Sequence, residues 1–150
     1  VIEYLRYNMR SQIFAKSLPL PITIGAIKRL EILQSKPELK DNLWKIANSL
    51  QSGLRKAGFN LGNTESAVTP VYLSGGVGEA TNLTLDLREN YGIFCSIVTY
   101  PVVPKDVILL RLIPTAVHTI DDVNYTIESF SSIKDKLEKG EYISEKLASF

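Results

Sequence analysis

A run of apolar residues at helical spacing between positions 39 and 57 constrains the fold more than any other feature of this sequence. Its members recur in steps of three and four: Leu39, Leu43, Ile46, Leu50, Leu54 and Ala57. This spacing predicts one long helix with one buried face. Ser35 is predicted to cap this helix and Pro37 suits its first turn, with Glu38 at the capping-box spacing. Gly58 is expected to end it, where a left-handed residue is favoured.

Weaker patterns predict further helices and a set of short strands. The strand-like runs are residues 67–73, 93–98 and 107–113, and the other helices are expected from residues 22, 79 and 119 onward. Residues 1–16 are expected to be irregular or short helical, and the prolines at 19 and 21 to break regular structure. Pro70 argues for an edge strand. The predicted fold class is α/β (α+β), a small, mostly antiparallel sheet covered by helices.

Composition excludes several classes of protein. The 150 residues are 45% apolar and 22% charged, with a formal net charge of +1, which fits one real core and excludes a disordered tail. The near-zero charge offers no surface for nucleic acid, and no apolar run reaches the roughly 20 residues of a membrane span. One histidine and one cysteine cannot build a Cys/His zinc site, so no metal is expected. Because the lone Cys95 allows no internal disulfide and no secretory signal is visible, we expect a cytoplasmic protein.

Arg111 is the most informative single residue. It lies within an apolar, strand-like run, and an arginine cannot lose its proton to suit such surroundings. A structural interpretation is an internal ion pair with Asp or Glu, or an outward-facing side chain on an exposed sheet face. The functional interpretation is a bidentate clamp on a ligand carboxylate or phosphate, which a planar guanidinium binds well. Residue type and setting leave both interpretations open.

The other candidates have plainer interpretations. His118 precedes a predicted helix cap, and packing or capping is favoured over acid/base work because no partner is placed by the sequence. Cys95 is expected to be a small buried hydrophobe. Residues 75–78 hold three glycines before a helix but lack a P-loop lysine, so they are predicted to form a plain turn. For Lys16 the plain interpretation is a solvated side chain.

Two motifs resemble the C-terminal signature of the α-oxoamine synthases, which are fold-type-I pyridoxal-phosphate (PLP) enzymes. These are YPVVPK at residues 100–105 and LRLIPTAVHT at residues 110–119. FAKSLP at residues 14–19 and the helix ending in AGF at residues 57–59 match the family as well. The family includes glycine C-acetyltransferase (2-amino-3-ketobutyrate CoA ligase), 8-amino-7-oxononanoate synthase and serine palmitoyltransferase. The resemblance leaves out only the last ten residues.

The resemblance implies a C-terminal fragment of an enzyme. The Schiff-base lysine, the aspartate on the pyridinium nitrogen and the stacking histidine belong to the family's large domain, so no catalytic residue is assigned here and the fragment alone is predicted to be inactive. In this interpretation residues 1–36 bridge to the PLP-binding large domain, residues 37–140 form the small domain, and residues 141–150 are a tail. The intact enzyme is expected to be a homodimer.

Four residues and one loop take roles from the resemblance. Arg111 matches the family arginine that binds the carboxylate of the amino-acid substrate, with His118 behind it as support and the loop 100–105 at the substrate entrance. Ala15 departs from the family, where a serine or threonine often reaches the cofactor phosphate across the dimer interface. Lys16 and Ser17 are therefore predicted to supply that phosphate contact instead.

The resulting functional prediction is a PLP-dependent acyltransferase that condenses an acyl-CoA with an amino acid to give a 2-amino ketone. The proline loop with Lys105 favours the glycine C-acetyltransferase branch, with serine palmitoyltransferase and 8-amino-7-oxononanoate synthase as alternatives. Two non-enzymatic alternatives remain: an amino-acid-sensing module that uses Arg111, and a dimerisation domain in which Arg111 forms an internal ion pair.

Overall fold

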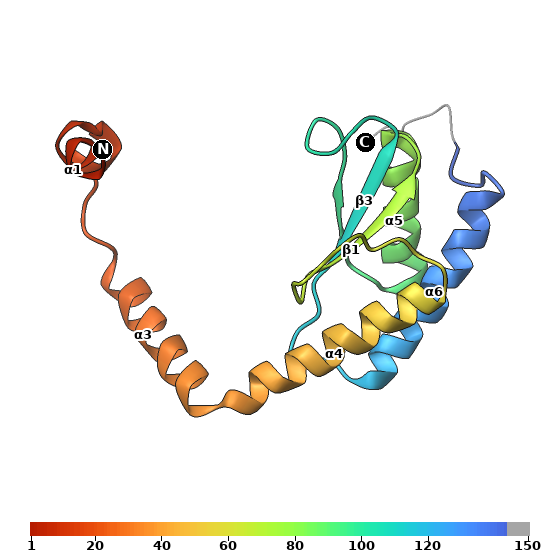
Figure 1. Ribbon diagram of the computed structural model, residues 1–150, viewed down its shortest axis with the longest axis horizontal. Helices are drawn as coiled ribbons and strands as arrows, with labels where there is room; N and C mark the ends of the chain where they lie inside the picture. Colours follow the sequence, from red (N-terminus) through yellow and green to blue (C-terminus); the bar gives the residue numbers. More distant parts are fainter. Residues whose placement is uncertain (144–150) are drawn as a thin grey trace. The chain divides into compact units, whose positions relative to one another are not determined.

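The computed structural model describes residues 1–143 and divides the chain into two compact units, Val1–Pro37 and Glu38–Phe150 (Figure 1). The first unit contains the helices α1 (Ile2–Asn8), α2 (Arg10–Ile13) and α3 (Leu20–Ser35). None of these helices has a buried residue. Of the two possibilities expected for residues 1–16, irregular or short helical, the structure forms short helices over most of the segment.

The start of α3 differs slightly from the prediction. The helix begins at Leu20 and takes Pro21 into its first turn, instead of beginning after both prolines. A proline is tolerated there because the first N–H groups of a helix have no partner within the helix. Pro19 forms the N-cap of α3 with an extended backbone.

The helix predicted from the apolar stripe is α4 (Pro37–Lys56), and its stripe is buried through Ile46, Leu50 and Leu54. The prediction that Ser35 caps it is wrong. Ser35 is the last residue of α3, and its hydroxyl donates to the carbonyl of Ile32. Gly58 has φ +81°, so it adopts the left-handed conformation expected at the end of the helix.

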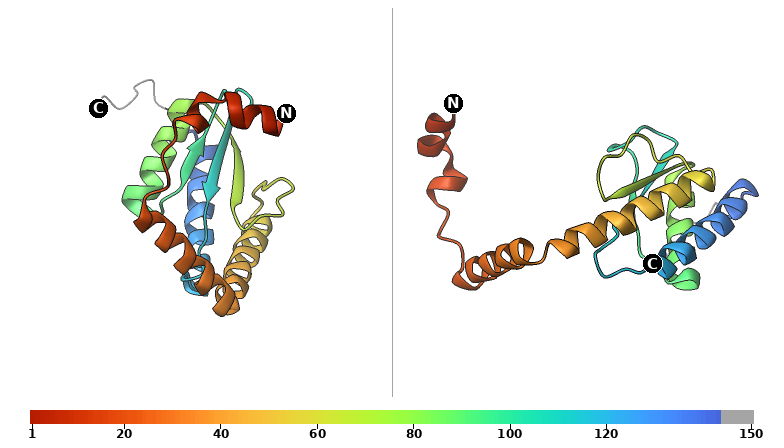
Figure 2. Two further views of the ribbon diagram at one scale, coloured as in Figure 1. Left: turned by 90° about the vertical axis from the view of Figure 1, so that its left-hand side faces the viewer. Right: turned by 60° about the horizontal axis from the view of Figure 1, so that its bottom comes forward.

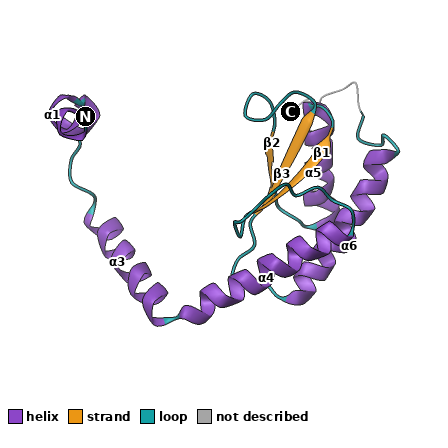
Figure 3. Cartoon of the chain, in the orientation of Figure 1, coloured by secondary structure: helices purple, strands orange, loops and turns teal. Residues whose placement is uncertain are grey.

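A three-stranded antiparallel sheet lies at the centre of the second unit (Figure 3). Its strands are β1 (Thr69–Ser74), β2 (Ser96–Val98) and β3 (Val107–Leu112), in the order β1-β3-β2. The two strands around the proline loop pair as predicted, and Pro70 lies in an edge strand. The fold class predicted from the sequence is confirmed.

The helices α4, α5 (Val77–Tyr91) and α6 (Ile120–Glu138) share one core with the sheet. The core joins Leu54 of α4, Leu87 of α5 and Phe130 of α6 to Ile108 and Leu110 of β3. Figure 2 gives two further views of these helices beside the sheet. Gly53 lies so close to Ile127 that a Cβ atom would collide with it, which lets α4 and α6 approach each other.

Alternation along β3 gives the sheet one buried and one open face. Ile108, Leu110 and Leu112 point into the core and are at most 5% exposed. The residues between them, Leu109 and Arg111, lie on the opposite face and keep contact with solvent. The three helices that share the core therefore pack on one side of the sheet, and Arg111 lies on the other.

The segment after α6 returns to the core through Tyr142, which is 5% exposed although the sequence placed it in a polar tail. Its hydroxyl donates to Asp86 Oδ2 at 2.6 Å, and Lys136 Nζ donates to the same oxygen at 2.8 Å. Residues 144–150 of the predicted tail lie outside the described residues. Within residues 1–143, none of the helices combines the length and apolar character that crossing a membrane requires.

Candidate functional site

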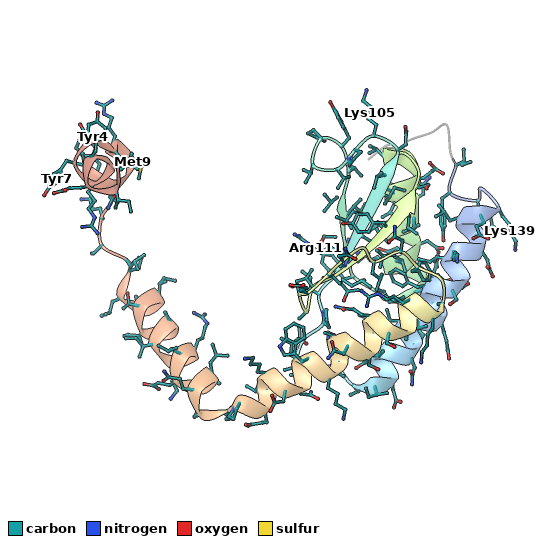
Figure 4. All side chains as sticks on the ribbon, viewed as in Figure 1. Tyr4, Tyr7, Met9, Lys105, Arg111 and Lys139 are labelled. Carbon is teal, nitrogen blue, oxygen red and sulfur yellow. The ribbon has the colours of Figure 1, made fainter. Side chains whose placement is uncertain are left out.

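Arg111 occupies the open face of the central strand, with Pro70 of β1 on one side and Ser96 of β2 on the other. Figure 4 labels it beside the sheet, and labels Lys105 on the loop that joins β2 to β3. The apolar run around Arg111 arises because every second residue of β3 points into the core. The position therefore combines an apolar sequence context with an exposed charge.

The guanidinium of Arg111 makes one hydrogen bond within the described residues, from Nε to Ser96 Oγ at 3.0 Å. The ion pairs among residues 1–143 are Lys28–Glu31, Arg88–Glu89 and Lys136–Asp86, so none of them involves Arg111. Arg111 therefore forms no internal ion pair within residues 1–143. The two terminal nitrogens of the guanidinium donate to no acceptor among residues 1–143, which leaves them free of these residues to bind an external anion.

His118 is fixed within a short turn after β3. Its Nδ1 accepts a hydrogen bond from the backbone N–H of Thr115 at 2.9 Å and lies 3.1 Å from the Thr115 hydroxyl. Its hydrogen bonds share no residue with those of Arg111, so no hydrogen bond described in residues 1–143 joins the two side chains. The structural interpretation of His118 as a turn and packing residue agrees with this geometry.

The turn leads into the N-terminal cap of α6, which the sequence predicted. Thr119 Oγ1 accepts from the backbone N–H of Asp122, and the Asp122 carboxylate accepts from the Thr119 backbone at 2.7 Å. These bonds from the Thr119 backbone and hydroxyl hold the pKa of Asp122 below its usual range. His118 and Asp122 border a mainly apolar groove of about 440 Å³.

The proline loop and the glycine turn line a second, smaller hollow of about 240 Å³. Lys105 Nζ lies 5.4 Å from the centre of the Tyr100 ring, a cation–π distance. The N–H of Gly76 donates to the Glu79 carboxylate at 2.7 Å, so the helix start is capped from within. Of the turn predicted at residues 75–78, Gly75 and Gly76 precede the helix, whereas Val77 and Gly78 are its first two residues.

Lys16 and Ser17 lie in the first unit, on the exposed segment between α2 and α3. Neither side chain has a hydrogen-bond partner among residues 1–143. The ammonium and the free backbone N–H groups can only donate, and the hydroxyl can donate as well, so this set suits a phosphate dianion. The residues present therefore fit the phosphate of a PLP cofactor.

Ser96 is the residue near Arg111 that the sequence did not single out. The feature that would have identified it is the pairing of the strands. In the register of β2 on β3, Ser96 is the direct partner of Arg111. Cys95, the neighbouring residue, is 4% exposed as predicted, and burial raises the pKa of its thiol to about 11. Within residues 1–143, no cluster of three or more His, Cys, Asp or Glu side chains could hold a metal ion.

Comparison with known proteins gives a consistent group of relatives, although no family model matches the chain. The cysteate-C-fatty acyltransferase of Capnocytophaga ochracea is 56% identical over 142 residues, covering 95% of this chain and 34% of that protein. The serine palmitoyltransferase of Sphingobacterium spiritivorum is 35% identical over 128 residues, 85% of this chain and 32% of that protein. The 2-amino-3-ketobutyrate coenzyme A ligase of Escherichia coli (strain K12) is 34% identical over 137 residues, 91% of this chain and 34% of that protein.

Solved structures place the fold in the same group. A structure of SPT (serine palmitoyltransferase) with PLP matches 87% of this chain and 33% of its own, with a TM-score of 0.75 and 28% identity. The chain thus spans about a third of the length of the relatives it matches.

Proposed function

The chain belongs to the α-oxoamine synthase family as a C-terminal domain, and from this premise we propose that it forms the amino-acid-binding side of a PLP-dependent acyltransferase. In this proposal residues 37–140 are the small domain and residues 1–36 lead to the PLP-binding large domain. The fragment alone lacks the family's Schiff-base lysine and is expected to be inactive.

The observation that carries the proposal is the state of Arg111. It is exposed on the open sheet face, it has no acidic partner among residues 1–143, and it lies within the motif at residues 110–119 that resembles the family signature. A guanidinium in this state binds a carboxylate through two parallel N–H···O bonds. Such a clamp fixes the orientation of the substrate's α-carbon, which favours one bond for reaction over the others.

PLP supplies an electron sink for charge that develops at the α-carbon of an amino acid. Lys16 and Ser17 would hold its phosphate, and in the proposed homodimer that cofactor belongs to the partner subunit. Arg111 would hold the substrate carboxylate, and the loop 100–105 would border the substrate entrance. In the overall reaction the acyl carbon of an acyl-CoA bonds to the α-carbon, and the bond from the α-carbon to the carboxylate breaks, so that CO2 leaves. The thioester C–S bond breaks as well, and coenzyme A takes up a proton and leaves as the thiol.

The choice of amino acid changes from the sequence-based prediction. Lys105 and its loop favoured glycine C-acetyltransferase, but identity is 56% to a cysteate-C-fatty acyltransferase and 34% to a 2-amino-3-ketobutyrate coenzyme A ligase. We therefore propose cysteate with a fatty acyl-CoA as the substrate pair. The lone buried Cys95 is compatible with the cytoplasmic setting proposed for the enzyme.

The test is a substrate comparison with the full-length protein that contains this chain. Cysteate, serine and glycine are each offered with palmitoyl-CoA and with acetyl-CoA, and release of coenzyme A is measured. The highest kcat/KM is expected for cysteate with palmitoyl-CoA. A preference for glycine with acetyl-CoA would restore the glycine branch, and no turnover with any pair would contradict an acyltransferase.

Arg111→Ala is expected to lower kcat/KM for the amino acid because it removes the clamp. The loss corresponds to about 2–5 kcal/mol of transition-state stabilisation. Arg111→Lys should recover only part, since an ammonium cannot make the two-point contact. Thermal unfolding checks that both variants remain folded. Unchanged kcat/KM in a folded Arg111→Ala variant would return Arg111 to a structural role.

A further inference from the structure

A single neighbouring side chain orients Arg111. We propose that Ser96 is a positioning residue that turns the guanidinium of Arg111 end-on toward the substrate carboxylate. This inference rests on the proposed function, because it assumes that Arg111 binds an amino acid.

The backbone register brings the two residues together. Ser96 in β2 pairs directly with Arg111 in β3, so both side chains lie on the open face of the sheet. Facing side chains in an antiparallel pair have Cβ atoms about 4.5–5.5 Å apart, a distance that a short hydroxyl can close. The resulting bond joins Arg111 Nε to Ser96 Oγ at 3.0 Å.

Ser96 is itself held by its neighbours in the chain. Cys95 is buried and Ile97 packs against the core, so the residues on both sides of Ser96 point inward. Their burial fixes the backbone of β2 and leaves Ser96 pointing to the open face. A hydroxyl anchored in this way is a fixed acceptor and not a mobile surface group.

On the opposite side of Arg111, the side chain of the paired residue offers no competing acceptor. Pro70 is its partner in β1, and a proline side chain has no hydrogen-bonding atom. The guanidinium is therefore held from the β2 side alone. An isolated exposed arginine would lose more rotamer freedom on binding a ligand, whereas one that is already oriented binds at a lower entropic cost.

The bond also decides which edge of the guanidinium can meet a ligand. A carboxylate can bind along the edge formed by Nε and one terminal nitrogen, or end-on at the two terminal nitrogens. Ser96 occupies Nε, so the end formed by Nη1 and Nη2 is the one that remains for a two-point contact. Ser96 thus selects the end-on mode and, through it, the direction of the substrate.

The experiment uses the full-length protein and the substitutions Ser96→Ala and Ser96→Thr. Ser96→Ala is expected to raise KM for the amino acid about tenfold, the effect of losing one hydrogen bond to a charged group. KM for the acyl-CoA should stay within twofold. Ser96→Thr keeps the hydroxyl and should restore KM for the amino acid. The matched control is Ser74→Ala, which removes a hydroxyl from the same sheet face in β1, opposite Val107, and should leave both constants unchanged.

A double-mutant cycle separates positioning from general damage. Arg111→Ala removes every donor that Ser96 could orient, so Ser96→Ala should cost nothing further in an Arg111→Ala background. An additive loss in that background, or an equal rise of both KM values, would overturn the role of Ser96. If Arg111→Ala impairs amino-acid binding while Ser96→Ala does not, the proposed function stands and this inference fails. If neither variant affects it, both fail.

Discussion

Two consecutive helices of this chain, α3 in the first unit and α4 in the second, are both rich in apolar residues but are buried to very different degrees. α4 buries Ile46, Leu50 and Leu54 together with two neighbours, whereas α3 buries none of its residues. The difference lies in how the apolar residues are arranged. In α4 they form one stripe, while in α3 they point around the helix, with exposed members at Leu20, Ile22, Ile24, Ile27, Leu30, Ile32 and Leu33.

A helix whose apolar residues are spread around its surface is typical of one that neighbouring segments cover in a larger protein. The chain spans about a third of the length of its relatives, so chain outside these residues is available in those proteins to cover such a helix. The second unit is therefore stabilised by its own core. We expect the first unit to need a surface from elsewhere in the protein to cover α3.

The largest effect on stability is expected when a core side chain of α4 is truncated. Leu54 is fully buried, and Leu54→Ala should reduce the free energy of unfolding by about 2–5 kcal/mol through lost burial and the cavity left behind. Leu30→Ala in α3 is the matched control. Leu30 is 56% exposed, so the same truncation should change stability by less than about 0.5 kcal/mol in this chain.

Urea unfolding of both variants measures the two values. Repeating the pair in the full-length protein sharpens the comparison, because a covered α3 should make Leu30→Ala costly there. Equal losses for both variants in the 150-residue chain would contradict the division into one self-stabilised and one dependent unit.

A second, smaller effect concerns the C-terminal end of the second unit. Tyr142 is buried there and bonded to Asp86, whereas the helices of the first unit have no buried residue. Burial alone would raise the pKa of Asp86, but the hydrogen bonds from Lys136, Tyr142 and Asn90 outweigh it and hold the pKa below the usual 3.8. Tyr142→Phe removes one of these bonds and should cost about 1.5–3 kcal/mol at neutral pH, as for a bond to a charged group.

The pH dependence follows from the direction of that shift. A carboxyl whose folded pKa is lowered stabilises the fold above its unfolded pKa, and this contribution is lost as the pH falls through the folded value. The stability difference between wild type and Tyr142→Phe should therefore shrink on acidification below about pH 4. A difference that is constant between pH 7 and pH 3 would show that Tyr142 contributes by packing alone.

The comparison also shows which features the sequence could predict. Local signals were sufficient for α4, for the left-handed Gly58, for the Thr119 cap and for Pro70 on an edge strand. Each of these depends on residues close together in the chain. The apolar spacing of α3 predicted a helix correctly but gave no information about whether that helix is covered.

Features that depend on pairing between distant residues could not be predicted. The partnership of Ser96 with Arg111 requires the register of β2 on β3, and the burial of Tyr142 requires its contact with Asp86, 56 residues away. Ser35 illustrates a competition between two local signals. It could cap α4 or end α3, and its bond to Ile32 in the preceding turn decided the outcome.

The smallest expected effect tests the one candidate site that lies in the first unit. Lys16 and Ser17 both offer hydrogen-bond donors, and Ala15 replaces a hydroxyl that resembling proteins often provide for the cofactor phosphate. In the full-length dimer, Lys16→Ala should weaken PLP affinity a few-fold and flatten its dependence on salt, because an exposed ion pair contributes at most about 1 kcal/mol and is screened by ions. Ala15→Ser should tighten binding by restoring a hydroxyl.

Lys28→Ala is the control, since it removes the same charge from a lysine that pairs with Glu31 within α3. Affinity measured against KCl concentration separates the variants, and a Lys16→Ala curve that follows the Lys28→Ala curve would remove Lys16 from the site and leave the phosphate to the large domain.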